Sequence, residues 1–164
     1  MQRHRGDGNR GRASLLLLSL FAALLLFGCS DGQTPEDRIR EMLAAAEIAA
    51  EERSLLDFQK FIADDYSDGK GRGKRDVTRV AAGYFLRNKS VHILTQVKRI
   101  DLLDEHRARV ELFAGMSSMP ASRVDELLAI RADLHRFDLE LEERDGEWLV
   151  ISAKWRRAGR EDFL

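Results

Sequence analysis

The sequence predicts an α+β fold in which N-terminal helices pack on a curved antiparallel sheet. Apolar residues recur at helical spacing over residues 35–88, and from residue 91 onward they alternate with polar residues. Helices therefore come first and strands last, which is typical of α+β proteins rather than of parallel α/β sheets. The pair Asp145-Gly146 favours a two-residue hairpin turn, so the last two strands are expected to be antiparallel neighbours.

The first helix is expected over residues 35–52. Thr34 is a suitable cap, Pro35 suits the first turn, and apolar residues follow at helical spacing. A second, shorter helix is expected to begin after Ser54, a second capping residue, and to end near residue 66. Together these helices precede a glycine-rich break in the pattern.

A segment rich in glycine and basic residues, 67–75, joins the second helix to the third. It lacks the glycine and hydroxyl positions of a phosphate-binding P-loop, so a flexible, solvated connector is the better interpretation. Asp76 is a candidate cap for the third helix. The apolar residues of that helix form one stripe: Val77, Val80, Ala81, Tyr84 and Phe85.

Four strands are expected after these helices. In the first strand the apolar phase changes near Lys98-Arg99, which predicts a β-bulge. One or two helical turns are expected over residues 122–128, between the second and third strands. The four predicted strands cover residues 91–102, 107–114, 132–144 and 147–157.

A two-residue turn at Asp145-Gly146 would pair Arg136 with Trp155 across the final hairpin. Three apolar residues of the last strand would then share the face turned away from the helices: Leu149, Ile151 and Trp155. Such a strip marks an interface more often than bare surface, so we expect a weak homodimer or a docking surface there. The alternative is that the charged tail, residues 158–164, covers the strip.

The N-terminal residues have the pattern of an export signal. Four arginines precede an apolar run over residues 13–27, which ends at Gly28 and Cys29. The run is shorter than the roughly 18 to 20 apolar residues that a membrane-spanning helix needs. Cys29 is the only cysteine, so no intramolecular disulfide is possible and the thiol needs another explanation.

The tetrad Leu26-Phe27-Gly28-Cys29 resembles a bacterial lipobox. The resemblance implies cleavage before Cys29, a diacylglyceryl thioether on its sulfur and an acylated amino group. Ser30 is not the aspartate that retains such lipoproteins at the inner membrane, so the outer membrane, facing the periplasm, is expected if the source has two membranes. The alternatives are an ordinary cleaved signal or an uncleaved anchor. The lipobox divides the chain into a signal peptide at 1–28, a lipidated tether at 29–34, a domain at 35–157 and a charged tail at 158–164.

Two segments of the domain resemble nuclear transport factor 2-like (SnoaL-like) proteins. They are Ala63-Asp64-Asp65-Tyr66-Ser67-Asp68 and Arg144-Asp145-Gly146-Glu147-Trp148-Leu149-Val150-Ile151, with Trp155 beyond the second. The resemblance spans about residues 35–157. It implies a cone in which three helices pack into the concave face of the sheet around a pocket, often in dimers. It implies no one activity, because function differs widely on this fold.

Enzymes of this family place an acidic or histidine base and tyrosines inside the cone. The candidate pocket-lining residues here are Asp65, Tyr66, Tyr84, Asp133 and His135. Asp133 and His135 lie two residues apart on one strand, so the carboxylate could tune the histidine. The alternative is a pair at the solvent rim, with both tyrosines in the core. No catalytic residue is therefore predicted.

Composition excludes several other functions. The net charge is −1 and both signs are interspersed, which argues against nucleic acid as a partner. The histidines lack paired ligand spacing, so no metal and no cofactor are expected. Three hypotheses remain: a non-enzymatic module that binds a small apolar ligand or an envelope protein, an enzyme acting on a small hydrophobic substrate in the cone, and an assembly factor that docks through its sheet.

Replacing Cys29 by alanine should stop incorporation of a labelled fatty acid and leave the precursor unprocessed, because the thioether has no other sulfur to form on. Metabolic labelling and mass spectrometry of the membrane fraction measure both effects. Unchanged membrane association and an unchanged mass in the variant would contradict the lipid anchor.

Overall fold

The fold is drawn from a computed structural model that describes residues 33–120, 123, 126, 133–159 and 162. The predicted signal peptide and the lipidation site at Cys29 lie outside the described residues. The helical turns predicted at 122–128 also lie outside them, apart from the two isolated positions. Among the described helices, none combines the length and the hydropathy needed to cross a bilayer.

α2 (Pro35–Glu51) begins at a capping box, close to the predicted start. The Asp37 N–H donates to the Thr34 hydroxyl, and the Thr34 N–H donates to the Asp37 carboxylate, both at 3.2 Å. These bonds satisfy two of the backbone groups that a helix start leaves free. The prediction of a helix over residues 35–52 is confirmed.

Two shorter helices follow, and the start of the second differs from its prediction. α3 (Leu55–Phe58) is capped by Ser54 and continues into the 3₁₀ turn η2 (Gln59–Phe61). α4 (Lys74–Arg87) begins earlier than a cap at Asp76 would place it. Gly73 is its N-cap, and the Asp76 carboxylate, already inside the first turn, accepts the Gly73 N–H at 3.3 Å.

The connector before α4 is folded around a buried carboxylate, so its interpretation as a solvated connector is wrong at this point. Asp68 Oδ1 accepts the backbone N–H groups of Lys70 at 2.8 Å and Arg72 at 3.0 Å. The Arg72 guanidinium donates to Oδ2 at 2.6 Å. Burial alone would raise the pKa of Asp68, but these donors outweigh it and lower that pKa, so the carboxylate stays charged.

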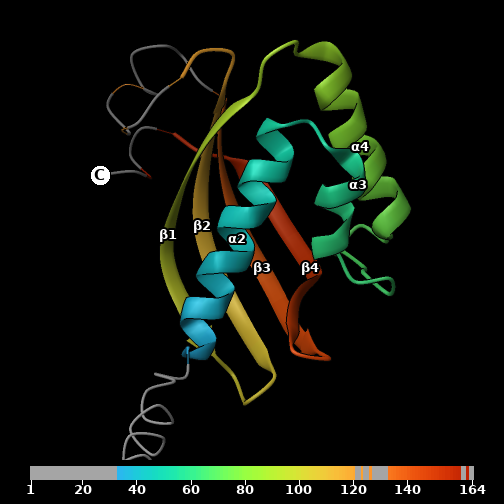
Figure 1. The fold of residues 1–164 in the computed structure, drawn as a ribbon, viewed down its shortest axis with the longest axis vertical. Helices are drawn as coiled ribbons and strands as arrows, with labels where there is room; N and C mark the ends of the chain where they lie inside the picture. Colours follow the sequence, from blue (N-terminus) through green and yellow to red (C-terminus); the bar gives the residue numbers. More distant parts are fainter. Residues whose placement is uncertain (1–32, 121–122, 124–125, 127–132, 160–161, 163–164) are drawn as a thin grey trace, which may run out of the picture. The chain divides into compact units, whose positions relative to one another are not determined.

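The sheet is a four-stranded antiparallel meander in the order β1-β2-β3-β4. It curves around α2, with α3 and α4 on the same side near β4 (Figure 1). The register shifts between Val97 and Arg99, which confirms the bulge predicted in the first strand. Asp145 and Gly146 have φ angles of 53° and 84°, as a type I′ turn requires, which fits the predicted two-residue hairpin turn. The strands are β1 (His92–Leu102), β2 (Arg107–Ser117), β3 (Asp133–Arg144) and β4 (Glu147–Arg157).

The helical half of the chain covers part of each edge of the sheet. On β1, the Ile93 N–H donates to Glu51 at 2.8 Å and the Thr95 N–H donates to Glu47 at 3.1 Å. On β4, the backbone of the 62–67 segment donates to two carbonyl oxygens: Ala63 to Val150 at 3.0 Å and Ser67 to Ile151 at 3.1 Å. Groups that are paired in this way are not available to a strand of another chain.

β4 contains a second bulge, which the sequence analysis above does not predict. Leu141 faces Val150, as a two-residue turn requires, but the next pair along the strands is Glu140 with Ser152. Ile151 is therefore the extra residue. Every pair beyond it is displaced by one position, so the side chains of β4 change faces there.

The displaced register corrects the predicted outer strip. Trp155 faces Phe137 rather than Arg136, and this places its ring on the concave side of the sheet. Leu149 keeps the predicted pairing with Glu142 on the outer side. Trp155 therefore does not share a face with Leu149, and the continuous strip of Leu149, Ile151 and Trp155 is wrong. Whether the remaining two residues form an interface stays a prediction.

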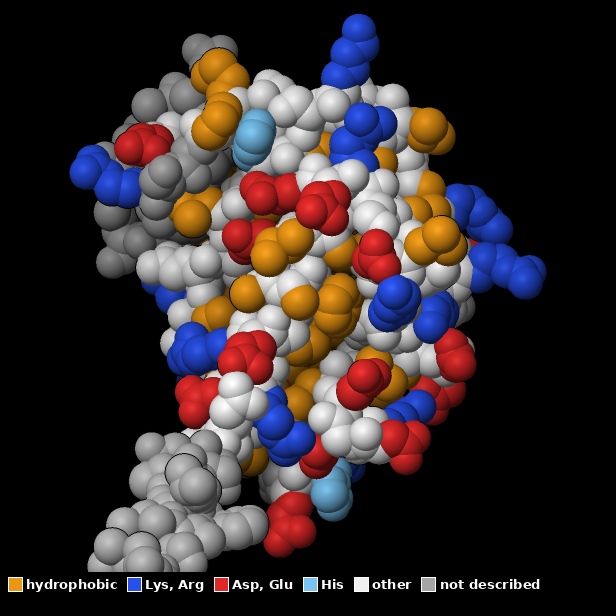
Figure 2. Space-filling view, viewed as in Figure 1, with side chains coloured by type: hydrophobic (Ala, Val, Ile, Leu, Met, Phe, Trp, Pro, Cys, Tyr) orange, Lys and Arg blue, Asp and Glu red, His pale blue; other side chains and the backbone are white. Residues whose placement is uncertain are grey.

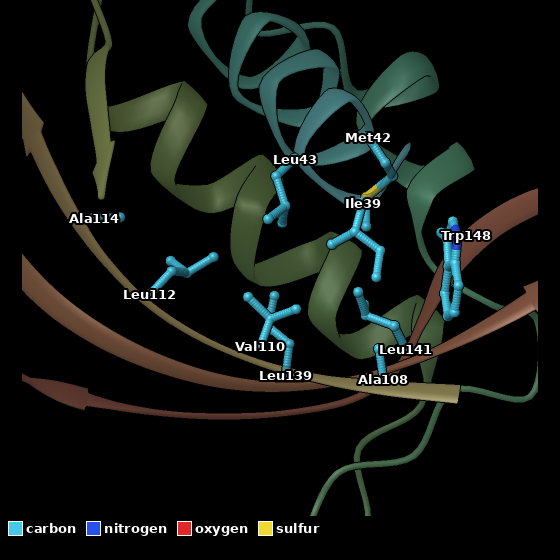
Figure 3. Close-up of a cluster of buried hydrophobic side chains, with 10 residues drawn as sticks. All are labelled: Ile39, Met42, Leu43, Ala108, Val110, Leu112, Ala114, Leu139, Leu141 and Trp148. Atoms are coloured by element: carbon cyan, nitrogen blue, oxygen red, sulfur yellow. The ribbon is translucent and has the colours of Figure 1, made fainter. Parts of the chain in front are cut away.

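The main core lies where α2 crosses the concave face (Figure 3). Three side chains of α2 point from above toward the side chains that rise from β2 and β3. Ile39, Val110 and Leu141 are the largest side chains that are fully buried. The cluster consists of Ile39, Met42, Leu43, Ala108, Val110, Leu112, Ala114, Leu139, Leu141 and Trp148.

Replacing Ile39 by alanine should lower the free energy of unfolding by about 2–5 kcal/mol, because its side chain is 0% exposed and would leave a cavity. The matched control is Ile48→Ala on the same helix, where 55% of the side chain is exposed and the expected change is within about 0.5 kcal/mol. Urea denaturation of residues 34–164 measures both. Equal losses in the two variants would contradict this packing.

Candidate functional site

The concave face carries three aromatic residues beside the buried core, and one of them, Phe137, packs against that core. His135, Phe137 and Trp155 are only half-buried there, and we call these three residues the aromatic row. Ring centroids are 6.2 Å apart between His135 and Phe137, and 6.3 Å apart between Phe137 and Trp155. The planes of the last pair are 27° apart, so their faces are stacked. α4 packs mainly against α3 and approaches the sheet less closely than α2 does.

A cation caps the β4 end of the aromatic row. The Arg72 guanidinium carbon lies 4.3 Å from the centroid of the Trp155 ring, which is cation–π geometry. Asp68 holds the same guanidinium from the other side through the 2.6 Å bond to Arg72 Nε. The cation that stacks on Trp155 is therefore Arg72. It is not Arg136, the residue that faces Trp155 in the strand pairing predicted from the two-residue turn.

Tyr66, a predicted pocket residue, lies beside this cation. The residue is 3% exposed, and its hydroxyl lies near the Ala153 backbone without a hydrogen bond of good geometry to any described group. Burial raises the pKa of Tyr66, and the negative charge of Asp68 raises it further. The phenol is therefore neutral at physiological pH and is able to donate one hydrogen bond.

Asp133 and His135 lie on one face of β3, but they do not form the predicted pair. Asp133 is exposed and its carboxylate accepts a hydrogen bond from Arg157 at 2.5 Å. His135 Nδ1 is buried and has no partner among the described residues. The carboxylate is thus engaged by a cation at the rim, while the imidazole belongs to the aromatic row.

The remaining candidates take structural positions. Tyr84 packs from α4 against a small cluster that includes Phe85 and Val91. Burial raises the pKa of Tyr84, and the charge of Asp133 adds to this effect. Asp65 is exposed and forms a bidentate ion pair with Arg144 at 2.8 and 2.9 Å, which lowers the pKa of Asp65. Tyr84 therefore belongs to a packed apolar cluster, and Asp65 to a surface ion pair.

Two depressions lie elsewhere on the described surface. One, of about 680 Å³, opens between α3 and Lys74. The other, of about 470 Å³, crosses the convex side of the sheet. Charged side chains line the second, including Arg109 and Glu140, which lie 3.5 Å apart.

Hydrophobic side chains also reach the surface between α2 and α3, with charged groups on either side (Figure 2). The described residues contain no group of three potential metal ligands.

Comparison with solved structures shows the fold. No family model and no curated protein matches the chain. A nuclear transport factor 2-like protein of unknown function from Shewanella oneidensis is similar, with 16% identity, a TM-score of 0.56, and coverage of 74% of this chain and 98% of the other. A cystatin-like protein of unknown function from Nostoc punctiforme is 13% identical, with a TM-score of 0.59 and coverage of 80% and 98%.

A third similar structure, Bd1075 of Bdellovibrio bacteriovorus, has 9% identity and a TM-score of 0.59. The match covers 74% of this chain but only 40% of the length of Bd1075. These likenesses confirm the α+β class and the cone-shaped, nuclear transport factor 2-like arrangement of helices on a curved sheet. At such low identity they concern the fold alone.

Tyr66 and His135 are predicted from the sequence as candidate site residues, but Arg72, Phe137 and the inward position of Trp155 are not. No alternation in the last strand could have identified the inward position of Trp155, because residues 148–151 are all apolar and do not distinguish the two faces.

Replacing Tyr66 by phenylalanine should raise the free energy of unfolding by about 1 kcal/mol, because it removes a buried hydroxyl that has no partner. Tyr84→Phe is the control, since the Tyr84 hydroxyl is not among the buried groups without partners. Thermal unfolding in ligand-free buffer measures both variants. A large loss of stability in Tyr66→Phe would show that the hydroxyl is already bonded within the domain.

Proposed function

We propose that this chain is a lipid-anchored envelope protein whose domain binds a small, planar, largely apolar ligand against the aromatic row. The observation that carries the proposal is a pair of buried polar atoms without partners, Tyr66 Oη and His135 Nδ1. His135 belongs to the aromatic row, and Tyr66 lies near Arg72, the cation that stacks on Trp155 at the other end of that row. Buried polar atoms are paired in nearly all native structures, so an unpaired atom near each end of the row suits a ligand that would pair them.

The chemistry of the site restricts the ligand class. Phe137 and Trp155 offer stacked ring faces, which suit a planar apolar group. Arg72 adds a fixed positive charge at one end, which suits a carboxylate or sulfonate on that ligand. The neutral Tyr66 hydroxyl suits a carbonyl or ether oxygen. We therefore expect a planar organic monoanion rather than a neutral lipid.

The lipid anchor remains part of the proposal on the strength of the tetrad that ends at Cys29. Acylation at that cysteine would place the domain at the outer membrane, facing the periplasm, in a bacterium with two membranes. Two or more acyl chains are needed for a stable anchor, and the lipobox resemblance implies more than one. The partner we propose for the outer sheet face is a second copy of this chain or an envelope protein.

The enzyme hypothesis stays a second candidate because of His135. A general base must lie within hydrogen-bond reach of its substrate, and His135 is the imidazole within the aromatic row. Asp133 is held by Arg157, and Tyr66 is a neutral phenol. Catalysis would therefore rest on one imidazole without an orienting carboxylate, and ligand binding is the simpler function.

Titration with anilinonaphthalene sulfonate tests the proposal, because this probe combines planar rings with one negative charge. The full-length chain should bind it saturably, and both Trp155→Ala and Arg72→Gln should weaken binding severalfold by removing the ring or the charge. Leu86→Ser is the matched control, since Leu86 is 84% exposed on the outside of α4. Equal affinity in all four proteins would contradict the proposed site, and circular dichroism checks that each variant is folded.

A further inference from the structure

The first turn of α2 and two strand turns lie at one end of the domain, and ionic contacts join them. Arg38 donates to Glu143 at 2.7 Å and reaches the Gly146 carbonyl at 3.4 Å. His106 Nδ1 lies 2.9 Å from the other Glu143 oxygen, and the Glu143 N–H donates to the His106 carbonyl at 2.8 Å. We call this end, made of residues 34–38, 102–107 and 143–147, the tether end. It lies at the bottom of the view in Figure 1.

The short segment between Cys29 and Thr34 limits how far the tether end can lie from the lipid proposed on Cys29. Only residues 30–33 separate Cys29 from Thr34. An extended chain advances about 3.3–3.6 Å per residue, so the first residue of the domain lies within roughly 17 Å of the lipid-bearing residue. A domain of this size has a radius of gyration of about 14 Å, so the tether end is the part that reaches the bilayer most easily.

Two adjacent leucines are exposed at the tether end. Leu102 is the last residue of β1 and is 39% exposed, and Leu103 in the following turn is 45% exposed. The Leu103 N–H donates to the Arg107 carbonyl at 2.8 Å, which closes the turn. Two neighbouring apolar side chains at the base of an exposed turn suit shallow insertion among lipid headgroups.

The charges around these leucines indicate which lipids they meet. Asp104 and Glu105 are exposed beside them and outnumber the one exposed arginine of the turn, Arg107, so this turn is not the basic patch that binds anionic membranes. Contact would therefore depend on apolar insertion and would not require anionic lipid. Headgroups that carry an ammonium group complement the two carboxylates.

We propose that the tether end lies against the bilayer, with Leu102 and Leu103 in the headgroup region of zwitterionic lipid. This inference rests on the proposed acylation of Cys29. It assigns the domain a defined orientation, in which β1 rises away from the membrane. The aromatic row lies on the parts of β3 and β4 that are farthest from the tether end. In this orientation the row would open away from the bilayer surface.

A depth measurement on the full-length acylated chain tests the orientation. Leu103→Cys and Leu86→Cys each introduce one free thiol for a nitroxide label, in vesicles of phosphatidylcholine. Leu86 is also exposed but lies near the start of β1, at the opposite end of the domain. The label at position 103 should collide severalfold more with oxygen, relative to an aqueous nickel complex, than the label at position 86. Leu102→Cys should behave like Leu103→Cys.

The wild-type chain separates failure of the anchor from failure of the orientation. If Cys29 carries lipid, the wild-type protein has no free thiol and takes up no label. Labelling of the wild type would overturn the anchor and, with it, this inference. An unlabelled wild type, together with equal nickel accessibility at positions 103 and 86, would overturn the orientation alone.

Discussion

The contact between the 62–67 segment and the edge of β4 determines the geometry of the proposed site. The N–H groups of Ala63 and Ser67 donate to the Val150 and Ile151 carbonyls, at the point where Ile151 bulges from the ladder. The bulge displaces the register by one residue and turns Trp155 to the concave side. The same contact positions Tyr66, which lies between the two bonded residues in the chain.

Uneven packing of the helices explains why one part of the concave face is core and the other is a candidate site. α2 lies close to β1, and its carboxylates pair with N–H groups of that edge strand. Its apolar residues fill the space above β2 and β3. α4 pairs chiefly with α3, and its stripe is only partly buried, with Val80 51% exposed. The rings above β3 and β4 are consequently left half-buried.

Local rules were enough to predict the elements, because capping residues, periodicity and the Asp145-Gly146 turn act within a few positions of the chain. The bulge in β1 was also predictable, since apolar residues change phase at Lys98-Arg99. The site was predicted only in part, because its geometry depends on long-range contacts. The bulge at Ile151, the stacking of Arg72 on Trp155 and the engagement of Asp133 by Arg157 all join residues distant in sequence.

The central claim is that Trp155 belongs to the concave face as part of the aromatic row. Nuclear Overhauser effects measured on residues 34–164 test this claim most directly. The account predicts cross-peaks from the Trp155 indole to the Phe137 ring and to the Arg72 side chain. Cross-peaks from the indole to the Arg136 side chain, with none to Phe137, would place Trp155 on the outer face and would contradict the account.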